Sequence, residues 1–247
     1  MKQPGDDPFR HLPGLRARIK PAEQSELRVT PDVLSMWTER ARLLGRPADW
    51  RWSDDAIEAS RLSILGGLPA DEDLWVFGYG SLMWDPGFHF TEVRLAELAG
   101  FQRRFSYRTT LGRGCPERPG LMLAIERCAG DCHGLAFRVA AEVAQAESSI
   151  VWRREMIRGG YSPVLLPLRT PQGPLTALSF APNLAHPDHV GELPLLQTAA
   201  HIASGVGVLG TNREYLEFLV AQLEHLGIDD AYMNELLVQV RRVPASC

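Results

Sequence analysis

The chain has 247 residues, of which 45% are hydrophobic and 23% are charged, which is ordinary for one large globular domain or one domain with an appendage. The formal net charge of -4 and the lack of a basic run give no electrostatic case for nucleic acid as a partner. No apolar run reaches membrane-spanning length, and Met1 to Lys20 contains no apolar signal core, so we expect a cytoplasmic protein without a membrane partner. The sequence makes no prediction about protein partners.

The cysteines and histidines predict no metal site. The cysteines are Cys115, Cys128, Cys132 and Cys247. Cys128 and Cys132 have no second pair that would complete a zinc site, and the spacing suggests no disulfide framework. His186 and His189 lie in a proline-flanked loop, but the sequence nominates no third ligand. We therefore expect free thiols in a reducing compartment and no bound metal.

The first 70 or so residues form a leader without recognisable chemistry. We expect a flexible arm from Met1 to about Glu26, followed by two short helices. Thr30-Pro31 is typical of an N-cap and first helical residue, and Gly45 of a helix end. Ser53 caps the second helix, which Gly66-Gly67 ends. The leader is interpreted as a packing appendage that covers a sheet edge or a neighbour.

A glycine-rich turn follows the leader and organises the rest of the chain. Leu74 to Phe77 is an apolar, β-prone run, after which Gly78 and Gly80 permit backbone angles and close approaches that a Cβ would forbid. Successive N–H groups at such a turn can form a nest for a carboxylate or an oxyanion. The alternative is a β-bulge or a tight corner. A phosphate loop is disfavoured because no lysine follows the glycines, and Ser81 lacks the G-x-S-x-G context of a nucleophile.

The next elements predict a mostly antiparallel sheet or a small barrel, because strands occur in sequence-adjacent pairs with few crossover helices. The expected hairpins are Val93–Ala99 with Phe101–Thr109 across Gly100, Leu121–Arg127 with His133–Val139 across Ala129–Asp131, and Val164–Leu168 with Ala177–Ala181 across Pro171–Pro174.

Helices interrupt and follow these strands. We expect them from about Ala141 to Arg158, from Leu195 to Ser204, from a capping box at Thr211 to Gly227, and from Asp229 or Asp230 to near Val243. In the third of these, an apolar stripe should face the core: Leu216, Leu219, Val220 and Leu223.

The helix near residue 150 carries a candidate acid–base group. At 100° per residue, one face collects Val143, Ala146, Ile150 and Ile157, and we expect this face to meet the sheet. Val151, Trp152, Glu155 and Met156 fall outside it, which suggests a second contact surface such as a cleft wall. Apolar neighbours would raise the pKa of Glu155 toward the range useful for proton transfer. The alternatives are that Glu155 pairs with Arg154 or Arg158, or is solvated; Arg154 itself lands near the core face.

Several of these segments together resemble the ChaC-type γ-glutamylcyclotransferases of the bacterial type, over roughly Leu74 to Val243. The run Val76-Phe77-Gly78-Tyr79-Gly80-Ser81-Leu82-Met83-Trp84 is similar to the family signature. Trp152-Arg153-Arg154-Glu155-Met156 followed by Gly160-Tyr161 resembles the segment with the catalytic glutamate. Further likenesses are Gly112–Gly114, Pro119–Ala124, Gly134–Arg138, Leu209–Asn212 and Tyr215-Leu216. The leader loosely resembles the N-terminal extension of bacterial members.

The resemblance implies a lyase that degrades glutathione to 5-oxoproline and cysteinylglycine without a metal or an organic cofactor. It implies an α+β fold, a small mixed, mainly antiparallel β-barrel with flanking helices. The helical N-terminal leader (residues 1–72) would precede a catalytic domain of residues 73–247. The alternatives are a catalytically dead binding module on the same fold, and a cyclotransferase for other γ-glutamyl compounds.

The resemblance also nominates the site. By this resemblance, Glu155 would be the catalytic base, which takes the ammonium proton and returns it to the leaving amine. The substrate-binding candidates are Val76, Phe77, Gly78, Tyr79, Gly80, Ser81, Leu82, Arg108, Arg113 and Tyr161. The glycine turn would supply N–H donors, while the two arginines would hold a carboxylate end of the tripeptide unless they are surface or strand-end charges.

Overall fold

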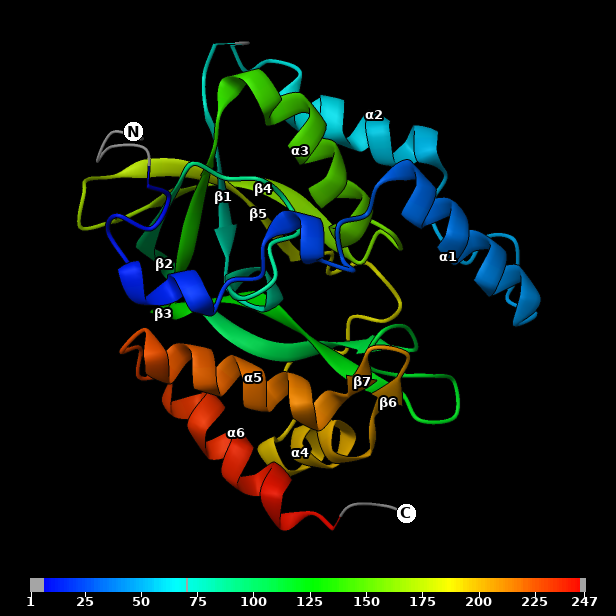
Figure 1. The fold of residues 1–247 in the computed structure, drawn as a ribbon. Coiled ribbons are helices and arrows are strands. Elements are labelled where there is room, and N and C mark those ends of the chain that lie inside the picture. Colours follow the sequence, from blue (N-terminus) through cyan, green and yellow to red (C-terminus); the bar gives the residue numbers. More distant parts are fainter. Residues whose placement is uncertain (1–6, 70, 245–247) are drawn as a thin grey trace. The chain divides into compact units, whose positions relative to one another are not determined.

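The structure, a computed structural model, describes residues 7–69 and 71–244, which divide into two compact units (Figure 1). The first unit comprises the chain up to Gly100 together with Asp131–Ala181, and the second comprises Phe101–Gly130 with the chain from Pro182. The leader therefore belongs to the same unit as the glycine turn.

The strands of the first unit belong to a five-stranded mixed sheet in the order β2-β3-β1-β5-β4, whose strands β2 and β3 continue into the second unit. Its strands are β1 (Leu74–Gly78), β2 (Glu92–Thr109), β3 (Gly120–Val139), β4 (Tyr161–Leu168) and β5 (Leu175–Pro182). Strand β1 is antiparallel to β3 and parallel to β5. Val76 pairs with Phe137 on one side and Leu178 on the other, and all three are fully buried. This central place explains why β1 reads as a continuous apolar run.

The expected closed barrel is not what the sheet forms. The sheet is open, with β2 and β4 at its edges. One isolated antiparallel bridge between Glu97 and Arg169 links the β2 edge to the residue after β4. Local sequence signals specify strands, whereas closure requires a full ladder between strands far apart in the chain. The α+β class with a mixed sheet is confirmed, and the barrel is a correction.

Two of the three predicted hairpins are also wrong. β2 runs through Gly100, and β3 runs through the segment Ala129–Asp131 where a turn was expected. A lone glycine inside a strand marks a local bend more often than a reversal, and Gly100 has a φ of 80°. These two places are where β2 and β3 pass from one unit to the other. The third hairpin is confirmed, with β4 and β5 on either side of Gly173.

Helix α3 (Ala141–Glu155) packs against the sheet with α2 (Asp54–Leu65) beside it (Figure 1). Trp152 is fully buried, with its ring 5.3 Å from that of Phe180 in β5 and its Nε1 donating to Ser60 Oγ of α2 at 3.3 Å. The predicted core face is wrong: of its four residues Ile150 is buried, Val143 and Ala146 are exposed, and Ile157 is half-buried. The surface that suggested a cleft wall is core, because α3 has neighbours on two sides.

The described part of the leader is packed, contrary to the expected flexible arm; Met1–Asp6 lie outside the described residues. Two short 3-10 helices, Pro13–Ala17 and Ala22–Gln24, precede α1 (Pro31–Leu43). Four apolar side chains of this segment are buried: Leu15, Ile19, Ala22 and Val29. Their irregular spacing gives no helical or strand period, so the sequence pattern did not reveal them.

A buried carboxylate anchors the leader to α3. Glu147 is 5% exposed and accepts two hydrogen bonds from Arg28, at 2.7 and 2.9 Å. It also accepts from the backbone N–H of His89 at 3.0 Å and contacts His89 Nδ1 at 2.9 Å. Burial opposes ionisation, but the bonds from Arg28 and His89 outweigh it and lower the pKa of Glu147 to about 2.

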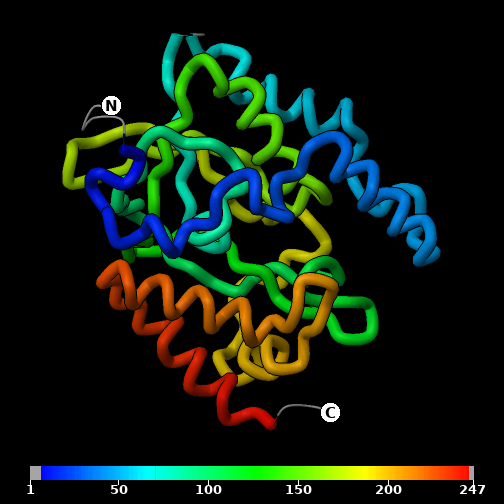
Figure 2. Tube along the Cα trace, viewed as in Figure 1, coloured from blue at the N-terminus to red at the C-terminus, as the bar shows by residue number. Residues whose placement is uncertain are grey.

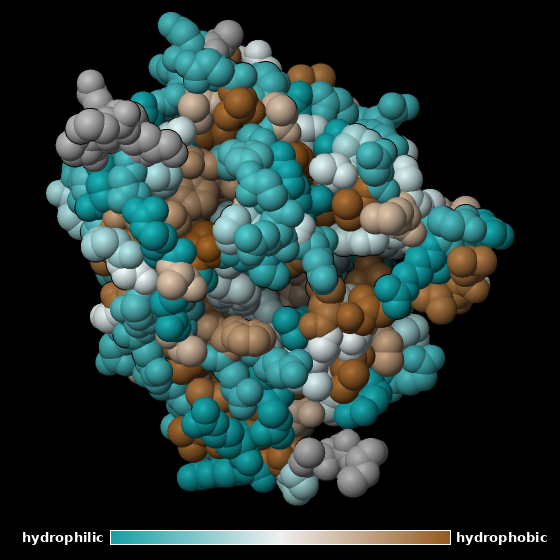
Figure 3. Space-filling model, in the orientation of Figure 1, coloured by the Kyte–Doolittle hydropathy of each residue, from teal (hydrophilic) through white to brown (hydrophobic). Residues whose placement is uncertain are grey.

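Helix α1 begins at its Thr30 cap as predicted and leaves apolar side chains in solvent. Met36, Leu43 and Leu44 are each more than 60% exposed. Figure 3 shows hydrophobic surface where α1 ends, at the right of the view. Among the described residues, no helix combines the length and the apolar character that a membrane crossing needs.

The second unit has three helices that pack on one another (Figure 2). They are α4 (Leu195–Ser204), α5 (Asn212–His225) and α6 (Ala231–Arg242), with the short strands β6 (Val206–Gly207) and β7 (Gly210–Thr211) between α4 and α5. The predicted capping box at Thr211 is confirmed, and Asp230 caps α6. The predicted stripe of α5, from Leu216 to Leu223, is buried.

The Glu147 anchor predicts a stability effect at Arg28. Arg28→Ala leaves a buried carboxylate without its bidentate partner, so we expect the free energy of unfolding at neutral pH to fall by about 2–3 kcal/mol, less than for a fully buried pair because Arg28 is partly exposed. The fold lowers the pKa of Glu147 from 4.5 to about 2. The ion pair therefore contributes its full stabilisation above a pH of about 4.5, and this contribution is lost as the pH falls toward about 2. Chemical denaturation across this range should show the deficit shrinking.

Arg42→Ala is the matched control, because Arg42 pairs with Glu39 in the same leader but both side chains are more than half exposed. It should leave the free energy of unfolding nearly unchanged. Equal effects from the two substitutions would contradict the anchor.

Candidate functional site

The glycine turn lies where β1 ends and is almost entirely buried. Strand β1 stops at Gly78, and a 3-10 turn covers Ser81–Met83. Of the predicted binding stretch from Val76 to Leu82, Ser81 alone is not buried. A Cβ at Gly78 would lie 2.8 Å from Leu82 Cβ and 3.4 Å from the Phe137 ring, so the turn requires glycine there for close approach. Ser81 is the side chain that this turn presents outward.

The two candidate tyrosines are both core residues of the first unit. Tyr79 is 8% exposed, and its hydroxyl donates to the Phe180 carbonyl of β5 at 2.6 Å. Tyr161 begins β4 and is 6% exposed. The hydroxyl of Tyr79 thereby ties the glycine turn to the neighbouring strand.

Glu155 is the last residue of α3 and lies in a nearly dry environment. Its side chain is 16% exposed, and its Oε1 is 3.1 Å from Nε of Arg154, the pairing that the sequence left open. Burial raises the pKa of the Glu155 carboxyl above its usual value, and the positive charge of Arg154 lowers it only in part. A carboxyl with a raised pKa suits proton transfer nearer neutral pH.

Arg154 connects Glu155 to the glycine turn. Its side chain is 8% exposed. Nη2 donates to Ser81 Oγ at 2.9 Å, and Nη1 donates to the carbonyls of Asp85 and Pro86 at 2.6 and 3.2 Å. One guanidinium thus brings together the predicted base and the half-buried Ser81 of the predicted binding turn.

The leader holds the segment that follows the turn. Ser25 donates to an Asp85 carboxylate oxygen at 2.5 Å, and Lys20 Nζ lies 3.5 Å from the other. The backbone N–H of Lys20 donates to the Trp84 carbonyl at 2.8 Å, and Arg28 donates to the Gly87 carbonyl at 3.0 Å. The residues that Arg154 contacts are therefore fixed from the leader side as well.

The two candidate arginines belong to the second unit, where both have protein carboxylates as partners. Arg108 is half exposed and lies 3.1 Å from Asp188. Arg113 donates to the Thr211 carbonyl at 3.2 Å and lies 3.4 Å from Glu214. The first unit holds Glu155, the glycine turn and Tyr161.

The two candidate histidines, His186 and His189, have side-chain partners in the second unit. Tyr107 Oη lies 2.8 Å from His186 Nδ1, and His189 Nε2 lies 2.9 Å from Glu126, which also accepts a bond from Ser106. No set of three or more His, Cys, Asp or Glu side chains in the described part of the chain is arranged to hold a metal. Among the described residues, Cys115, Cys128 and Cys132 form no disulfide; Cys247 lies outside the described residues.

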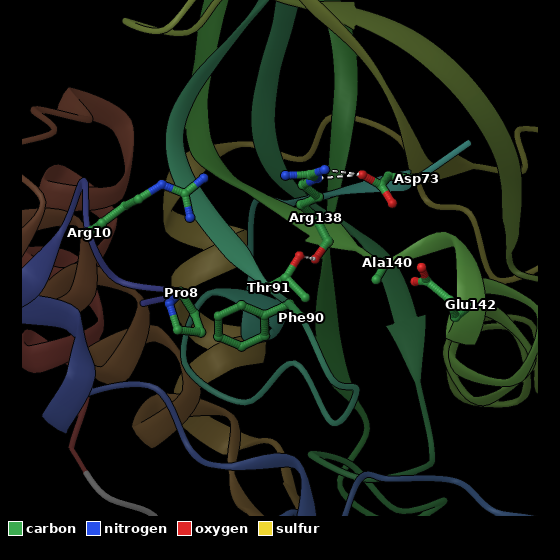
Figure 4. Close-up of a pocket in the computed structure, with 8 residues that line it drawn as sticks. All are labelled: Pro8, Arg10, Asp73, Phe90, Thr91, Arg138, Ala140 and Glu142. Carbon is green, nitrogen blue, oxygen red and sulfur yellow. Dashed lines mark hydrogen bonds and ion pairs between the residues drawn. The ribbon is translucent and has the colours of Figure 1, made fainter. Parts of the chain in front are cut away.

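A separate pocket of about 360 Å³ lies in the first unit (Figure 4). Its lining includes Arg10, Asp73, Phe90, Arg138 and Glu142, none of which is a predicted site residue. Figure 4 shows Arg138 turned toward Asp73, and Nε donates to that carboxylate at 2.5 Å. Arg10 in turn pairs with the buried Glu92. Both arginines of this pocket thus have carboxylate partners, and none of its lining residues is a predicted site residue.

Comparison with known proteins identifies a family to which the chain is similar. A family model described as ChaC-like protein matches residues 74–243, more than half of the chain. This chain belongs to the ChaC family. The match begins at β1 and ends one residue after α6, so in this ChaC family member it contains Glu155 and the glycine turn and leaves out the leader.

Two relatives and one solved structure illustrate the likeness. The glutathione-specific gamma-glutamylcyclotransferase of Escherichia coli (strain K12) is 38% identical over 195 residues, 78% of this chain and 84% of the relative. The glutathione-specific gamma-glutamylcyclotransferase 1 of Rattus norvegicus is 35% identical over 147 residues, 58% of this chain and 66% of the relative. The crystal structure of a yeast gamma-glutamylcyclotransferase specific to glutathione has a TM-score of 0.64 at 23% identity, covering 69% of this chain and 96% of that one. The last likeness concerns the fold alone.

Sequence reasoning missed the segment from Trp84 to Gly87 and the connecting role of Arg154. The sequence did contain one indication that Arg154 has buried partners, because it lies near the predicted core face of the helix and a buried charge is usually paired. The carbonyls of Asp85 and Pro86 carry no sequence signal, since any residue supplies a carbonyl.

The close approach at Gly78 predicts a packing defect in Gly78→Ala. The added methyl group meets Leu82 Cβ, which cannot rotate away, so the turn must shift. We expect the free energy of unfolding to fall by about 1–3 kcal/mol, the usual cost of overpacking. Thermal and chemical denaturation measure the change.

Gly67→Ala serves as control, because a Cβ at Gly67 meets no atom within 4 Å. This variant should match the wild type or exceed it slightly. An unchanged stability in Gly78→Ala would show that the turn tolerates a side chain.

Proposed function

We propose that this ChaC family protein degrades glutathione, releasing 5-oxoproline and cysteinylglycine, as a glutathione-specific γ-glutamylcyclotransferase. The observation that carries the proposal is its 38% identity to the glutathione-specific enzyme of Escherichia coli, across 84% of that relative. The proposed catalytic and binding residues all come from the part of the chain after residue 72. A cytoplasmic location, expected from the sequence, stays a prediction.

The reaction is an internal acyl transfer. The α-amine of the γ-glutamyl group attacks the side-chain amide carbonyl of the same group, and a five-membered ring forms. The C–N bond to the cysteinyl residue then breaks, and the leaving amine takes up a proton. Because nucleophile and electrophile lie in one flexible group, holding it bent supplies much of the catalysis, up to about 7–11 kcal/mol in favourable cases.

Glu155 is the proposed base. The α-ammonium must lose a proton before its nitrogen can attack, and a carboxylate can take this proton and return it to the leaving amine. Burial raises the pKa of Glu155, which brings the basicity of the carboxylate closer to that of the groups it serves. Activity should accordingly rise with pH through a pKa above the ordinary glutamate value.

The glycine turn is the proposed binding element for the glutamyl group. Its backbone N–H groups would hold the glutamyl carboxylate or the developing oxyanion, and one such donor is worth roughly 3–4 kcal/mol in other enzymes. Two observations support this role for Ser81: it is the one residue of the stretch from Val76 to Leu82 that is not buried, and it accepts its bond from Arg154. Tyr161, Arg108 and Arg113 remain proposed binding residues, although both arginines have carboxylate partners.

Product analysis tests the proposal directly. Purified protein incubated with glutathione should release 5-oxoproline and cysteinylglycine in equal amounts, and γ-glutamyl-alanine should give little 5-oxoproline. Release from both compounds would indicate a broader γ-glutamylcyclotransferase. Release from neither would overturn the proposed function in favour of a binding module.

The role of Glu155 predicts a specific outcome for Glu155→Gln. The amide keeps the shape and can still hydrogen bond, but it cannot take the ammonium proton. Turnover should fall by about 10²–10⁴ while affinity for glutathione survives, because the turn holds the substrate. Initial rates of 5-oxoproline release and calorimetric binding separate the two effects.

Glu142→Gln is the control, since Glu142 is an exposed carboxylate in the first turn of the same helix. It should leave turnover at the wild-type level. Near-normal turnover in Glu155→Gln would remove Glu155 from the mechanism.

A further inference from the structure

Arg154 is a buried cation whose three side-chain nitrogens each have a partner from this chain. Nη2 donates to Ser81 Oγ, Nη1 to two consecutive backbone carbonyls, and Nε lies against the Glu155 carboxylate. With the side chain 8% exposed, the guanidinium has little surface for a substrate carboxylate. Its contacts are those of a group that places other groups.

The contact between Arg154 and Glu155 is not the usual pairing of helix neighbours. Adjacent residues in a helix point about 100° apart, and side chains that meet are three or four positions apart. Here the helix ends at Glu155, and Met156 is already its C-cap. Since the carbonyls of Asp85 and Pro86 fix the guanidinium plane, the carboxylate that bonds to Nε is placed by groups outside the helix.

The same guanidinium sets the direction of the Ser81 hydroxyl. A hydroxyl has one donor and two acceptor positions, and Arg154 can only donate. Ser81 Oγ therefore accepts from Nη2 and keeps its own hydrogen for another acceptor. A substrate carboxylate or an oxyanion at the turn is such an acceptor.

Arg154 is a charged residue in direct contact with the Glu155 carboxylate, and its charge affects the pKa of that carboxylate. Asp85 contributes its carbonyl to Arg154, while its carboxylate is engaged by Ser25 and Lys20. Two further basic residues flank Glu155 in the sequence, Arg153 on α3 and Arg158 just after it. Arg154 lowers the pKa of Glu155 against the larger effect of burial.

We propose that Arg154 is a positioning residue for the cyclisation, fixing the Glu155 carboxylate and directing the Ser81 hydroxyl toward the substrate. The proposal rests on the proposed role of Glu155 as the base. Arg154 contacts no reacting atom in this scheme. It acts by holding two groups, one that moves the proton and one that binds the glutamyl end, in a fixed relation.

Two substitutions separate the effect of the positive charge of Arg154 from the effect of its planar guanidinium, which donates in several directions. Arg154→Met removes both, so turnover of glutathione should fall about 10–100-fold, and the acidic limb of the pH profile of kcat/KM should move up by about one unit. The sign follows because losing a nearby cation raises the pKa of a base that must be ionised to act. Arg154→Lys keeps the charge but cannot bridge three segments, so turnover should fall while the limb stays near its wild-type pH.

Arg153→Met is the matched control, one position earlier on α3, and should change neither turnover nor the limb. A folded Arg154→Met with an unmoved limb would overturn the proposal, as would wild-type turnover in Arg154→Lys. Should Arg154→Met fail to fold, as judged by circular dichroism and melting, Arg154→Lys alone decides. Glu155→Gln measured in parallel distinguishes the failures. Normal turnover there refutes the base and, with it, the positioning role, whereas a loss there beside wild-type turnover in Arg154→Lys refutes the positioning role alone.

Discussion

A guanidinium removed from water must find acceptors within the protein, and this requirement at Arg154 shapes much of the first unit. Neither α3 nor β1 supplies enough of them. The chain after the glycine turn therefore runs so that the carbonyls of Asp85 and Pro86 face the cation. That segment is irregular, and an irregular segment stays in place only if other parts of the protein hold its polar groups. The leader does so, with Lys20 and Ser25.

The leader and α3 are joined by a second buried charge of the opposite sign. Glu147 takes two bonds from Arg28 and two contacts from His89, so a carboxylate with low solvent access remains ionised to about pH 2. Both ion clusters bridge the leader to the catalytic part of the chain. A segment without chemistry of its own thus contributes to the environment in which the proposed chemistry takes place.

The sequence predicted the elements that local signals control. Caps at Thr30, Ser53 and Thr211 and the helix-ending glycines gave the helices nearly to the residue, because a cap is a contact between neighbours in the chain. The hairpin predicted at Gly100 was wrong, because a glycine permits both a chain reversal and a bend within a strand, and the pairing of the strands decides between them. The prediction for the core face of α3 was wrong because the helix buries Trp152 against β5 and α2, and the helical period does not reveal which neighbours a helix will have. Resemblance to the family nominated Glu155 and the glycine turn as site residues. The carbonyl partners of Arg154 could be found only in the structure, because a backbone carbonyl carries no sequence signal.

The two long strands also determine how this protein can be divided. The chain passes between its two compact units at residues 100, 130 and 181, so neither unit corresponds to one continuous stretch of the gene. A fragment of the gene that ends at residue 100 or 130 would cut β2 or β3 in its middle and leave unpaired strand edges. A fragment that is to contain either unit intact therefore has to keep the region from β1 to α6 as a single block.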